Sequence, residues 1–306
     1  MEVDLASAGR VVCFGEVLLR LSAPGDQLLL QSAAFDVCVG GAEANVAVSL
    51  ARLGAQTSVV TILPDNPLGR GARDELRRHG VDTTGAAFVP GRMGIYYLTR
   101  GAVLRPAEVT YDRAESAFAR GAAGIDWDRA LEGAAWLHVS GVTPAVGPNG
   151  AKGAVEAVRA ARRRGLSVSF DGNFRASMWA TWNDDPAPIL TSVFENADIA
   201  FADERDIGLL LGRDFSGGDV AERRALAAAA AFEAFPNLQR LCATVRTHRD
   251  VAHQALSAMM FTRQGRCVTG EYALSGIVDR IGAGDAFAAG VLHGLINGRG
   301  DQDSLE

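Results

Sequence analysis

Residues 279–287 read DRIGAGDAF and place two glycines and an aspartate at the start of a strongly apolar helical segment. The first N–H groups of a helix lack partners within the helix, and the helix dipole adds positive potential there. Because glycine lets an anion approach the backbone closely, Gly282, Ala283 and Gly284 are predicted to form an anion site for a transferring phosphoryl group. Asp285 is expected to stay ionised beside these groups and to accept a hydroxyl proton. The alternative is an ordinary glycine turn with Asp285 as a helix-start residue.

A second pair of glycines, Gly40 and Gly41, opens another helical pattern, GGAEANVAVSLARLG, over residues 40–54. Small residues recur on one face at helical spacing, and Gly54 is suited to a C-cap. The pattern predicts a helix packed tightly on a sheet, with the paired glycines where a ligand can touch the backbone. Asn45 lies in the first turn, either as a binding residue or as a simple helix-start residue.

These two segments resemble the signature motifs of the ribokinase-like carbohydrate kinases, the PfkB family: Gly-Gly-x-x-x-Asn-x-Ala near the start and Asp-x-x-Gly-Ala-Gly-Asp near the end. The resemblance implies one kinase domain over residues 1–306, a three-layer α/β/α fold with a mostly parallel central sheet. It also implies a small β lid, formed from segments near 15–40 and 92–113, that covers the sugar site and often supports a homo-oligomer. Kinases of this family continue with another helix that forms part of the wall of the adenine pocket. The C-terminus of this sequence is therefore expected to be shorter than theirs.

Composition agrees with one large α/β domain and argues against some classes of binding partner. The 306 residues are 48% hydrophobic, enough to bury a large core, and the formal net charge of −6 argues against a nucleic-acid or anionic-membrane surface. The four cysteines form no C-x-x-C pair, so neither a zinc site nor a disulfide framework is indicated. The acidic N-terminus lacks a signal-peptide pattern, and the alanine-rich tract at 225–232 is too short to span a bilayer. The expected location is the cytoplasm.

Lys152 is the only lysine, and nearly all positive charge is carried by arginine. A Walker loop requires Gly-Lys-Ser/Thr, which does not occur, and Lys152 lies in a helical pattern as a solvated residue, which disfavours a Schiff-base enzyme. No G-x-G-x-x-G dinucleotide fingerprint occurs either. Any nucleotide chemistry must therefore rely on backbone amides and arginine.

Short apolar runs alternate with amphipathic helical patterns along the chain. The predicted strands are residues 11–14, 58–63, 136–140, 166–170, 199–201 and 241–244, and the predicted helices are 67–79, 150–164, 203–211 and 220–235. This alternation favours a largely parallel sheet covered on both faces, with functional residues at the carboxyl ends of the strands. Strand patterns at 36–39 and 94–99 interrupt this alternation. By the resemblance they are strands of the lid, and without the resemblance they are only extra strands at an edge of the sheet.

Further segments resemble the branch of the family that phosphorylates 2-keto-3-deoxygluconate: residues 15–22, 63–69, 111–114 and 136–144, and the Glu-Ala-Asn form of the first motif. A six-carbon acid calls for planar, bidentate donors at its carboxylate and for a hydroxyl held near a base. By resemblance, Arg113 and Arg175 would hold the acid end. The other substrate-binding residues expected on this ground are Gly40, Gly41, Asn45, Tyr96, Tyr111 and Asn173.

The chemistry implied by the resemblance is direct, in-line transfer of a phosphoryl group from ATP to the 6-hydroxyl, with Asp285 as the base and Mg²⁺ bridging the nucleotide phosphates. Kinases of this family commonly carry Asn-x-x-Glu after the strand that here ends at residue 201, where it helps to organise Mg²⁺. In this sequence Asp203 and Asp206 take those places and are the candidate metal residues, acting through water.

Nucleotide contacts are expected from two segments. Thr244-Val245-Arg246 replaces the usual Thr-x-Gly-x-x-Gly phosphate loop and resembles the Thr-Leu-Arg form of an acid-sugar kinase subgroup. Thr244 and Arg246 are therefore expected to contact ATP, together with Gly282 and Gly284. A monovalent-cation requirement is left open.

Other interpretations remain beside this one. A fructokinase- or ribokinase-like enzyme would share the catalytic residues and differ at the arginines, while the altered metal motif favours a sugar- or nucleotide-binding protein without turnover. Taken alone, any arginine here is an ordinary solvated residue. Tyr97 competes with Tyr96 for the inward position, because neighbouring strand residues face opposite ways. Asp171 is read as a turn former and His138 as a core histidine.

Overall fold

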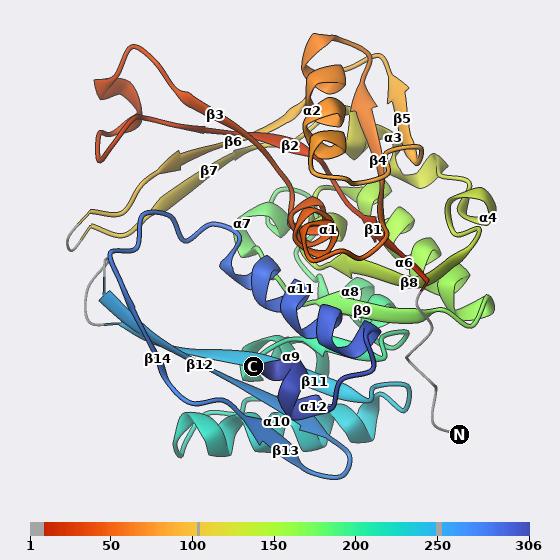
Figure 1. Ribbon diagram of the computed structural model, residues 1–306, viewed down its shortest axis with the longest axis vertical. Helices are drawn as coiled ribbons and strands as arrows, with labels where there is room; N and C mark the ends of the chain where they lie inside the picture. Colours follow the sequence, from red (N-terminus) through yellow and green to blue (C-terminus); the bar gives the residue numbers. More distant parts are fainter. Residues whose placement is uncertain (1–8, 103–104, 249–252) are drawn as a thin grey trace.

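The computed structural model describes residues 9–102, 105–248 and 253–306, and these form a ten-stranded main sheet with helices on both faces (Figure 1). The strand order is β13-β12-β11-β10-β9-β8-β1-β4-β5, and β14 pairs with β12. The pairs from β11 to β5 along this order are parallel, whereas β12, β13 and β14 add an antiparallel edge. The strands are β1 (Arg10–Phe14), β4 (Thr57–Pro64), β5 (Ala86–Val89), β8 (Ala134–Ser140), β9 (Ser167–Asp171), β10 (Ile199–Phe201), β11 (Arg240–His248), β12 (His253–Thr262), β13 (Arg266–Val268) and β14 (Tyr272–Ser275).

Two hydrophobic cores fill the space between the sheet and its helices. Alternate residues of β1 enter opposite cores, Val12 and Phe14 on one face and Val11 and Cys13 on the other, as the two-residue period of a strand requires. Over the Val11 face lie α1 (Ala42–Arg52), α2 (Pro67–Arg78), α11 (Ala283–Ile296) and α12 (Asp301–Leu305). The Val12 side holds α3 (Ala117–Gly121), α4 (Trp127–Ala130), α5 (Val142–Ala145), α6 (Pro148–Arg163), α7 (Ala176–Trp179), α8 (Ala187–Phe194), α9 (Glu204–Leu211) and α10 (Val220–Ala234).

A second, smaller sheet extends away from α1, above the segment that leads into α11 (Figure 1). Its order is β3-β2-β6-β7, and its strands are β2 (Leu18–Ser22), β3 (Asp36–Gly40), β6 (Gly94–Thr99) and β7 (Glu108–Asp112). A short 3₁₀ turn, Leu29–Gln31, lies between β2 and β3, and another, Ala122–Gly124, follows α3. The chain thus leaves the main sheet twice to build this small sheet, between β1 and α1 and between β5 and α3.

The ribokinase-like three-layer arrangement expected from the sequence is confirmed. The predicted strands and helices are all present, with ends shifted by up to four residues. The largest shift is at residues 241–244, where the strand continues to His248 because it pairs along its length with β12. The sequence patterns did not predict that partner strand, because β12 is the antiparallel neighbour of β11, whereas the alternating pattern favours a helix before the next strand. Among the described residues, no helix is long and apolar enough to cross a membrane.

Two glycines of α2 provide an internal comparison of packing. A Cβ at Gly69 would collide with the carbonyl oxygen of Pro64, whereas a Cβ at Gly71 would meet nothing within 4 Å. Gly69→Ala is expected to destabilise the protein by about 1–3 kcal/mol because the backbone must shift. Gly71→Ala should stabilise it by about 0.5–1 kcal/mol, since alanine is the better helix former. Denaturant unfolding of both variants checks this, and equal effects of the two substitutions would contradict the described packing of α2 on β4.

Candidate active site

The two glycine-opened helices meet at their N-terminal ends. Asn45, in the first turn of α1, donates from Nδ2 to Oδ2 of Asp285, in the first turn of α11, at 2.7 Å. Each helix begins at a glycine with positive φ, 145° at Gly41 and 84° at Gly282, which L side chains rarely adopt. Gly40 lies beside them, since a Cβ there would be 4.0 Å from Oδ1 of Asn45. Two positive helix ends therefore lie beside one carboxylate.

The backbone at the start of α11 offers hydrogen-bond donors. Gly282 is left-handed, and its carbonyl accepts the N–H of Ala286 at 2.8 Å. The N–H of Ala283 donates to the carbonyl of Arg280 at 3.3 Å, so this amide is engaged in the turn. Within the described ranges, the N–H groups of Gly282 and Gly284 make no backbone hydrogen bond. Two of the three amides predicted for the anion site are thus unpaired.

Carboxylates gather next to this helix start. Asp171 ends β9, and Asp206 lies against the following residue, because a Cβ on Gly172 would be 2.9 Å from the Asp206 carboxylate carbon. Burial, together with the charges of Asp285 and Asp206, raises the pKa of Asp171 to about 8. Burial and the charge of Asp203 raise the pKa of Asp206 to about 6. Burial also raises the pKa of Asp285, although its hydrogen bond from Asn45 opposes the shift.

Arg175 is the cation that faces these acids. Its positive charge lowers the pKa values of Asp171, Asp206 and Asp285 against the effect of burial. The side chain is exposed at the start of α7, and Nη1 donates to the carbonyl of Phe174 at 3.2 Å. An exposed guanidinium beside a carboxylate cluster is placed to receive an anion.

The Asp-Gly-Asn-Phe-Arg segment makes a tight turn between β9 and this arginine. Asn173 has a φ of 36°, in the left-handed region, and its N–H donates to Oδ1 of Asp171 at 3.1 Å. Asparagine tolerates this conformation better than most residues. Asp171 is therefore both the turn former that the sequence indicates and a member of the acidic cluster.

Asp203 and Asp206 form a reciprocal capping box at the start of α9. The carboxylate of Asp203 accepts the N–H groups of Arg205 at 2.8 Å and Asp206 at 3.3 Å, while Asp206 accepts the N–H of Asp203 at 3.0 Å. Asp203 also pairs with the Arg205 guanidinium at 2.5 Å, which lowers its pKa. Of the two predicted metal residues, Asp206 is thus the one that faces the acidic cluster. No group of three or more metal-ligating side chains occurs among the described residues.

One face of the small sheet carries a row of polar and aromatic side chains. Cys38, Arg20, Tyr96 and Tyr111 are neighbours across β3, β2, β6 and β7, so their side chains share a face. The Tyr96 and Tyr111 rings lie 6.4 Å apart, and burial raises the pKa of Tyr96 to about 12. Tyr97 packs instead against Phe35, 6.2 Å away. Tyr96 and not Tyr97 therefore lies on the face that carries Arg20, and its role in binding substrate stays a prediction.

Arg113 is buried at the root of the small sheet. Its Nε donates to Oε2 of Glu16 at 2.5 Å, and its Nη1 lies 3.6 Å from the sulfur of Met178. Glu16 also accepts the hydroxyl of Ser116, and a Cβ on Gly94 would collide with its carboxylate. Arg113 is therefore already oriented by an internal carboxylate, a pairing that the sequence did not indicate.

Glu43 fixes the start of α1 to the carboxyl end of β8. Its Oε1 accepts three donors: the N–H of Ser140 at 2.8 Å, the Ser140 hydroxyl at 2.7 Å and the Thr143 hydroxyl at 2.7 Å. Burial raises its pKa despite these hydrogen bonds. Because Glu43 is only two residues from Asn45, this network holds the asparagine that contacts Asp285. The buried acid was visible in the first motif, but its partners were not.

Thr244 and Arg246 lie in a strand and not in a loop. Both belong to β11, where the carbonyl of Thr244 accepts Nη2 of Arg224 at 2.8 Å. Nη1 of Arg246 donates to Oε1 of Gln254 at 2.8 Å, and burial with the nearby charge of Arg280 lowers the pKa of Arg246. Arg280 belongs to the segment 279–287, so Arg246 lies on the side of β11 toward the start of α11.

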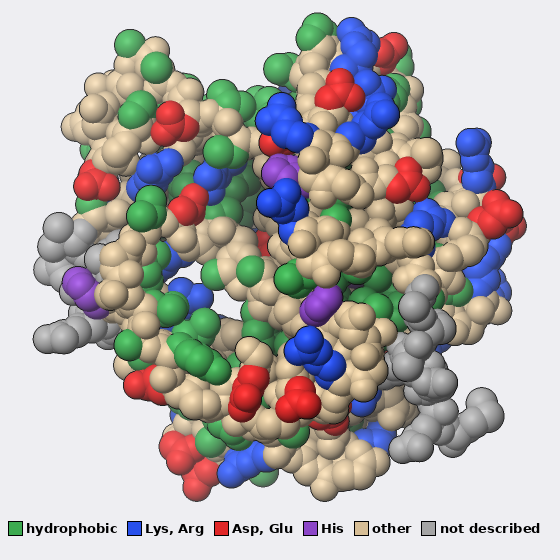
Figure 2. Space-filling model, in the orientation of Figure 1, with side chains coloured by type: hydrophobic (Ala, Val, Ile, Leu, Met, Phe, Trp, Pro, Cys, Tyr) green, Lys and Arg blue, Asp and Glu red, His purple; other side chains and the backbone are tan. Residues whose placement is uncertain are grey.

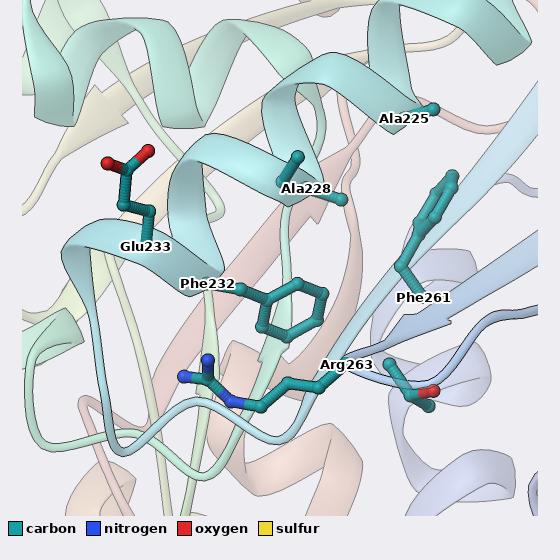
Figure 3. Close-up of a pocket in the computed structure, with 8 residues that line it drawn as sticks. Ala225, Ala228, Phe232, Glu233, Phe261 and Arg263 are labelled. Carbon is teal, nitrogen blue, oxygen red and sulfur yellow. The ribbon is translucent and has the colours of Figure 1, made fainter.

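The molecule is hollowed between the small sheet and the main sheet, with charged side chains around the opening (Figure 2). Two surface grooves lie elsewhere. One, of about 400 Å³, runs between α10 and β12, where Arg263 stacks over Phe232 at 5.4 Å (Figure 3). The other, of about 530 Å³, lies beside α9. Neither groove is lined by a residue predicted for the site.

Comparisons with known proteins place the chain among carbohydrate kinases. Residues 8–239 match the family described as "pfkB family carbohydrate kinase". A 2-dehydro-3-deoxygalactonokinase from Haloferax volcanii is 32% identical over 296 residues, which cover 96% of this chain and 87% of the relative. A 2-dehydro-3-deoxygluconokinase from Bacillus subtilis is 28% identical over 96% of this chain and 86% of the relative. The solved structure of 2-dehydro-3-deoxygluconokinase from Thermotoga maritima is 37% identical, with a TM-score of 0.90 over 97% of this chain and 90% of that one.

The raised pKa of Asp171 gives stability a testable pH dependence. The folded state binds more protons than the unfolded state between the ordinary pKa of 3.8 and about 8, so stability falls as pH rises through this window. Asp171→Asn removes the charge that causes the loss and keeps an oxygen for the N–H of Asn173. Its melting temperature should therefore exceed that of the wild type by more at pH 9 than at pH 5, measured by thermal unfolding.

The exposed Asp214 provides the control, because its pKa lies below its ordinary value and therefore below the tested range. Asp214→Asn should change the melting temperature by the same amount at pH 5 and pH 9. A pH-independent effect of Asp171→Asn would contradict the buried, crowded environment described for Asp171.

Proposed function

The chain belongs to the PfkB family of carbohydrate kinases, and from that premise we propose that it phosphorylates the 6-hydroxyl of 2-keto-3-deoxygluconate, also called 2-dehydro-3-deoxygluconate, with ATP. The product is 2-keto-3-deoxy-6-phosphogluconate. The observation that carries the proposal is the contact of Asn45 with Asp285 between two helix starts, beside the exposed Arg175. Relatives named for the gluconate and galactonate epimers support a sugar-acid acceptor.

Asp285 is proposed as the general base. A carboxylate whose pKa is raised by burial accepts a proton more readily than an exposed one, and Asn45 holds one of its oxygens in place. The acceptor hydroxyl gives its proton to Asp285 while its oxygen attacks the γ-phosphorus, and the bond from phosphorus to the ADP oxygen breaks. The N–H groups of Gly282 and Gly284 then donate to the phosphoryl oxygens as negative charge develops on them.

The acid end of the substrate is assigned to arginine. Arg175 offers an exposed guanidinium near the base, and Arg113 is oriented by Glu16 through only one of its five N–H donors. Tyr96 and Tyr111 face the same side of the small sheet as Arg20 and would shape the pocket, together with Gly40, Gly41 and Asn173. In this assignment the small sheet is a lid that excludes water from the transfer.

ATP and Mg²⁺ are the expected cosubstrate and metal of this family. Asp206 and Asp171 supply carboxylate oxygens, the donors that Mg²⁺ prefers, and a bound cation would offset the burial and the neighbouring negative charges that raise their pKa values. Mg²⁺ supplies charge neutralisation at the nucleotide phosphates when it is bound. The side chain of Asp206 would hold it through water, and Thr244 and Arg246 would contact the nucleotide.

The small sheet is also the proposed surface for a homo-oligomer. Leu30 and Val37 are 94% and 60% exposed, and Leu28 and Phe35 are exposed beside them on the segment from β2 to β3. A second copy that covered this segment would remove apolar surface from water. The four cysteines are free thiols, which supports the cytoplasm as the location.

The acceptor preference tests the proposed function directly. With ATP and Mg²⁺, a coupled ADP-release assay should show fast turnover with 2-keto-3-deoxygluconate or its galactonate epimer and slow turnover with fructose, ribose or adenosine. Neutral acceptors lack the carboxylate that would accept hydrogen bonds from Arg175 and Arg113, so the enzyme should strongly prefer the sugar acids. Arg175→Gln should raise the KM for the acids by about 10- to 100-fold through loss of a charge-assisted hydrogen bond, whereas Arg52→Gln on the surface should not. Faster turnover with fructose, or no ADP release with any acceptor, would refute the assignment.

Asp285→Asn separates catalysis from binding. The amide keeps the shape of the side chain but cannot accept the proton, so kcat should fall by about 10²- to 10⁴-fold with little change in the affinity for the sugar acid. Because burial disfavours the Asp285 charge, the variant should melt at the same temperature as the wild type or higher. Steady-state kinetics measures kcat, and isothermal titration calorimetry measures the affinity for the sugar acid. A variant with nearly normal kcat would show that Asp285 is not the general base.

A further inference from the structure

An ion pair joins the small sheet to the segment that leads into α11. Nη1 of Arg20, in β2, lies 2.7 Å from Oδ2 of Asp279, and the two side chains are 13% and 32% exposed. Arg20 and Asp279 are 259 residues apart in the chain. The contact therefore connects two separate parts of the structure, the small sheet and the segment that leads into α11 (Figure 1).

The same aspartate also shapes the turn before α11. Oδ1 of Asp279 accepts the N–H of Ile281 at 2.9 Å, and the next residue is Gly282, the left-handed residue at the start of the helix. One oxygen of the carboxylate thus holds the turn, and the other holds Arg20. If the small sheet moves relative to α11, either the ion pair between Arg20 and Asp279 breaks or Asp279 moves together with Arg20.

Arg20 is held in place from its own sheet as well. Nη2 donates to Sγ of Cys38 at 3.4 Å, and Arg20 pairs in register with Tyr96 on the other neighbouring strand. The hydrogen bond to Cys38 and the nearby Asp279 and Tyr96 raise the pKa of Arg20 against the opposing effect of burial. The guanidinium therefore lies on the face that carries Tyr96 and Tyr111, toward the start of α11.

We propose that Arg20 is a positioning residue that couples closure of the small sheet to the backbone geometry at Gly282 and Asp285, through Asp279. The proposal rests on the proposed kinase function for its catalytic consequence. Closure of the small sheet brings Arg20 to Asp279. The Asp279 carboxylate, held by Arg20, then fixes the turn that presents the N–H donors of α11 and the Asp285 carboxylate. When the small sheet opens, Asp279 keeps only its local hydrogen bond and the turn loosens.

A second ion pair of the small sheet provides the matched control. Nη2 of Arg100 lies 3.6 Å from Oδ2 of Asp36, with side chains 26% and 52% exposed. Both residues belong to the small sheet and its connections, so this pair cannot transmit movement to α11. Exposed ion pairs of this kind contribute little to stability.

Hydrogen exchange in the ligand-free protein tests the coupling without any activity assay. Arg20→Gln should speed amide exchange in residues 279–287, and Asp279→Asn should reciprocally speed exchange in β2. Arg20→Lys, which keeps the charge, should retain most of the protection, and Arg100→Gln should leave residues 279–287 at the wild-type rate. Unchanged exchange in residues 279–287 of Arg20→Gln, in a variant that still melts cooperatively, would overturn the proposal.

Kinetics test the catalytic consequence. Arg20→Gln should lower kcat with the preferred sugar acid by about 10- to 100-fold, the size expected of a small misplacement of catalytic groups, and should raise ADP release without acceptor relative to turnover. On the Asp279→Asn background, Arg20→Gln should change kcat less than about twofold, because the contact is already lost. Additive effects of the two substitutions, or a wild-type kcat for Arg20→Gln, would overturn the positioning role. If the wild type phosphorylates no acceptor, the proposed function fails and the exchange result alone decides the coupling.

Discussion

The hydrogen bond from Asn45 to Asp285 is the contact on which the site depends. It joins two helices from opposite ends of the chain at their N-terminal ends, where unpaired N–H groups and the helix dipoles favour negative charge. Both helices must begin at glycines, because their first residues take backbone conformations that side chains disfavour. Glu43 secures one of these helix starts to the main sheet, and Asp279 secures the other to the small sheet.

The acidic cluster around this contact is balanced by few cations. Burial raises the pKa values of Asp171, Asp206 and Asp285, nearby carboxylates add to the shifts of Asp171 and Asp206, and Arg175 only partly compensates them. Such crowding costs folding free energy, and it is typical of sites that bind cations or move protons. In the proposed function, arginine, backbone amides and carboxylates at this place take the role that a phosphate-binding lysine has in other kinases.

Local sequence patterns predicted the fold and the two helix starts well, because glycine pairs, apolar runs and helical spacing act over a few residues. The resemblance to the family pointed to Asp285, Asn45 and Arg175 as site residues, and the structure brings them close together. Partners of buried charges could not be predicted in this way. Arg113 pairs with Glu16, and Arg20 with Asp279, through contacts set by how the small sheet lies on the main one. The role of Asp171 in the acidic cluster, and the antiparallel partner of β11, likewise depend on neighbours distant in sequence.

The most direct measurement is a crystal structure of the protein with 2-keto-3-deoxygluconate and a non-hydrolysable ATP analogue with Mg²⁺. The proposed mechanism predicts the 6-hydroxyl within about 3 Å of the Asp285 carboxylate, the hydrogen-bond reach required of a general base. It also predicts the substrate carboxylate at Arg175 and the terminal phosphate at the N–H groups of Gly282 and Gly284. A sugar acid bound with its 6-hydroxyl away from Asp285, or a terminal phosphate far from the start of α11, would contradict it.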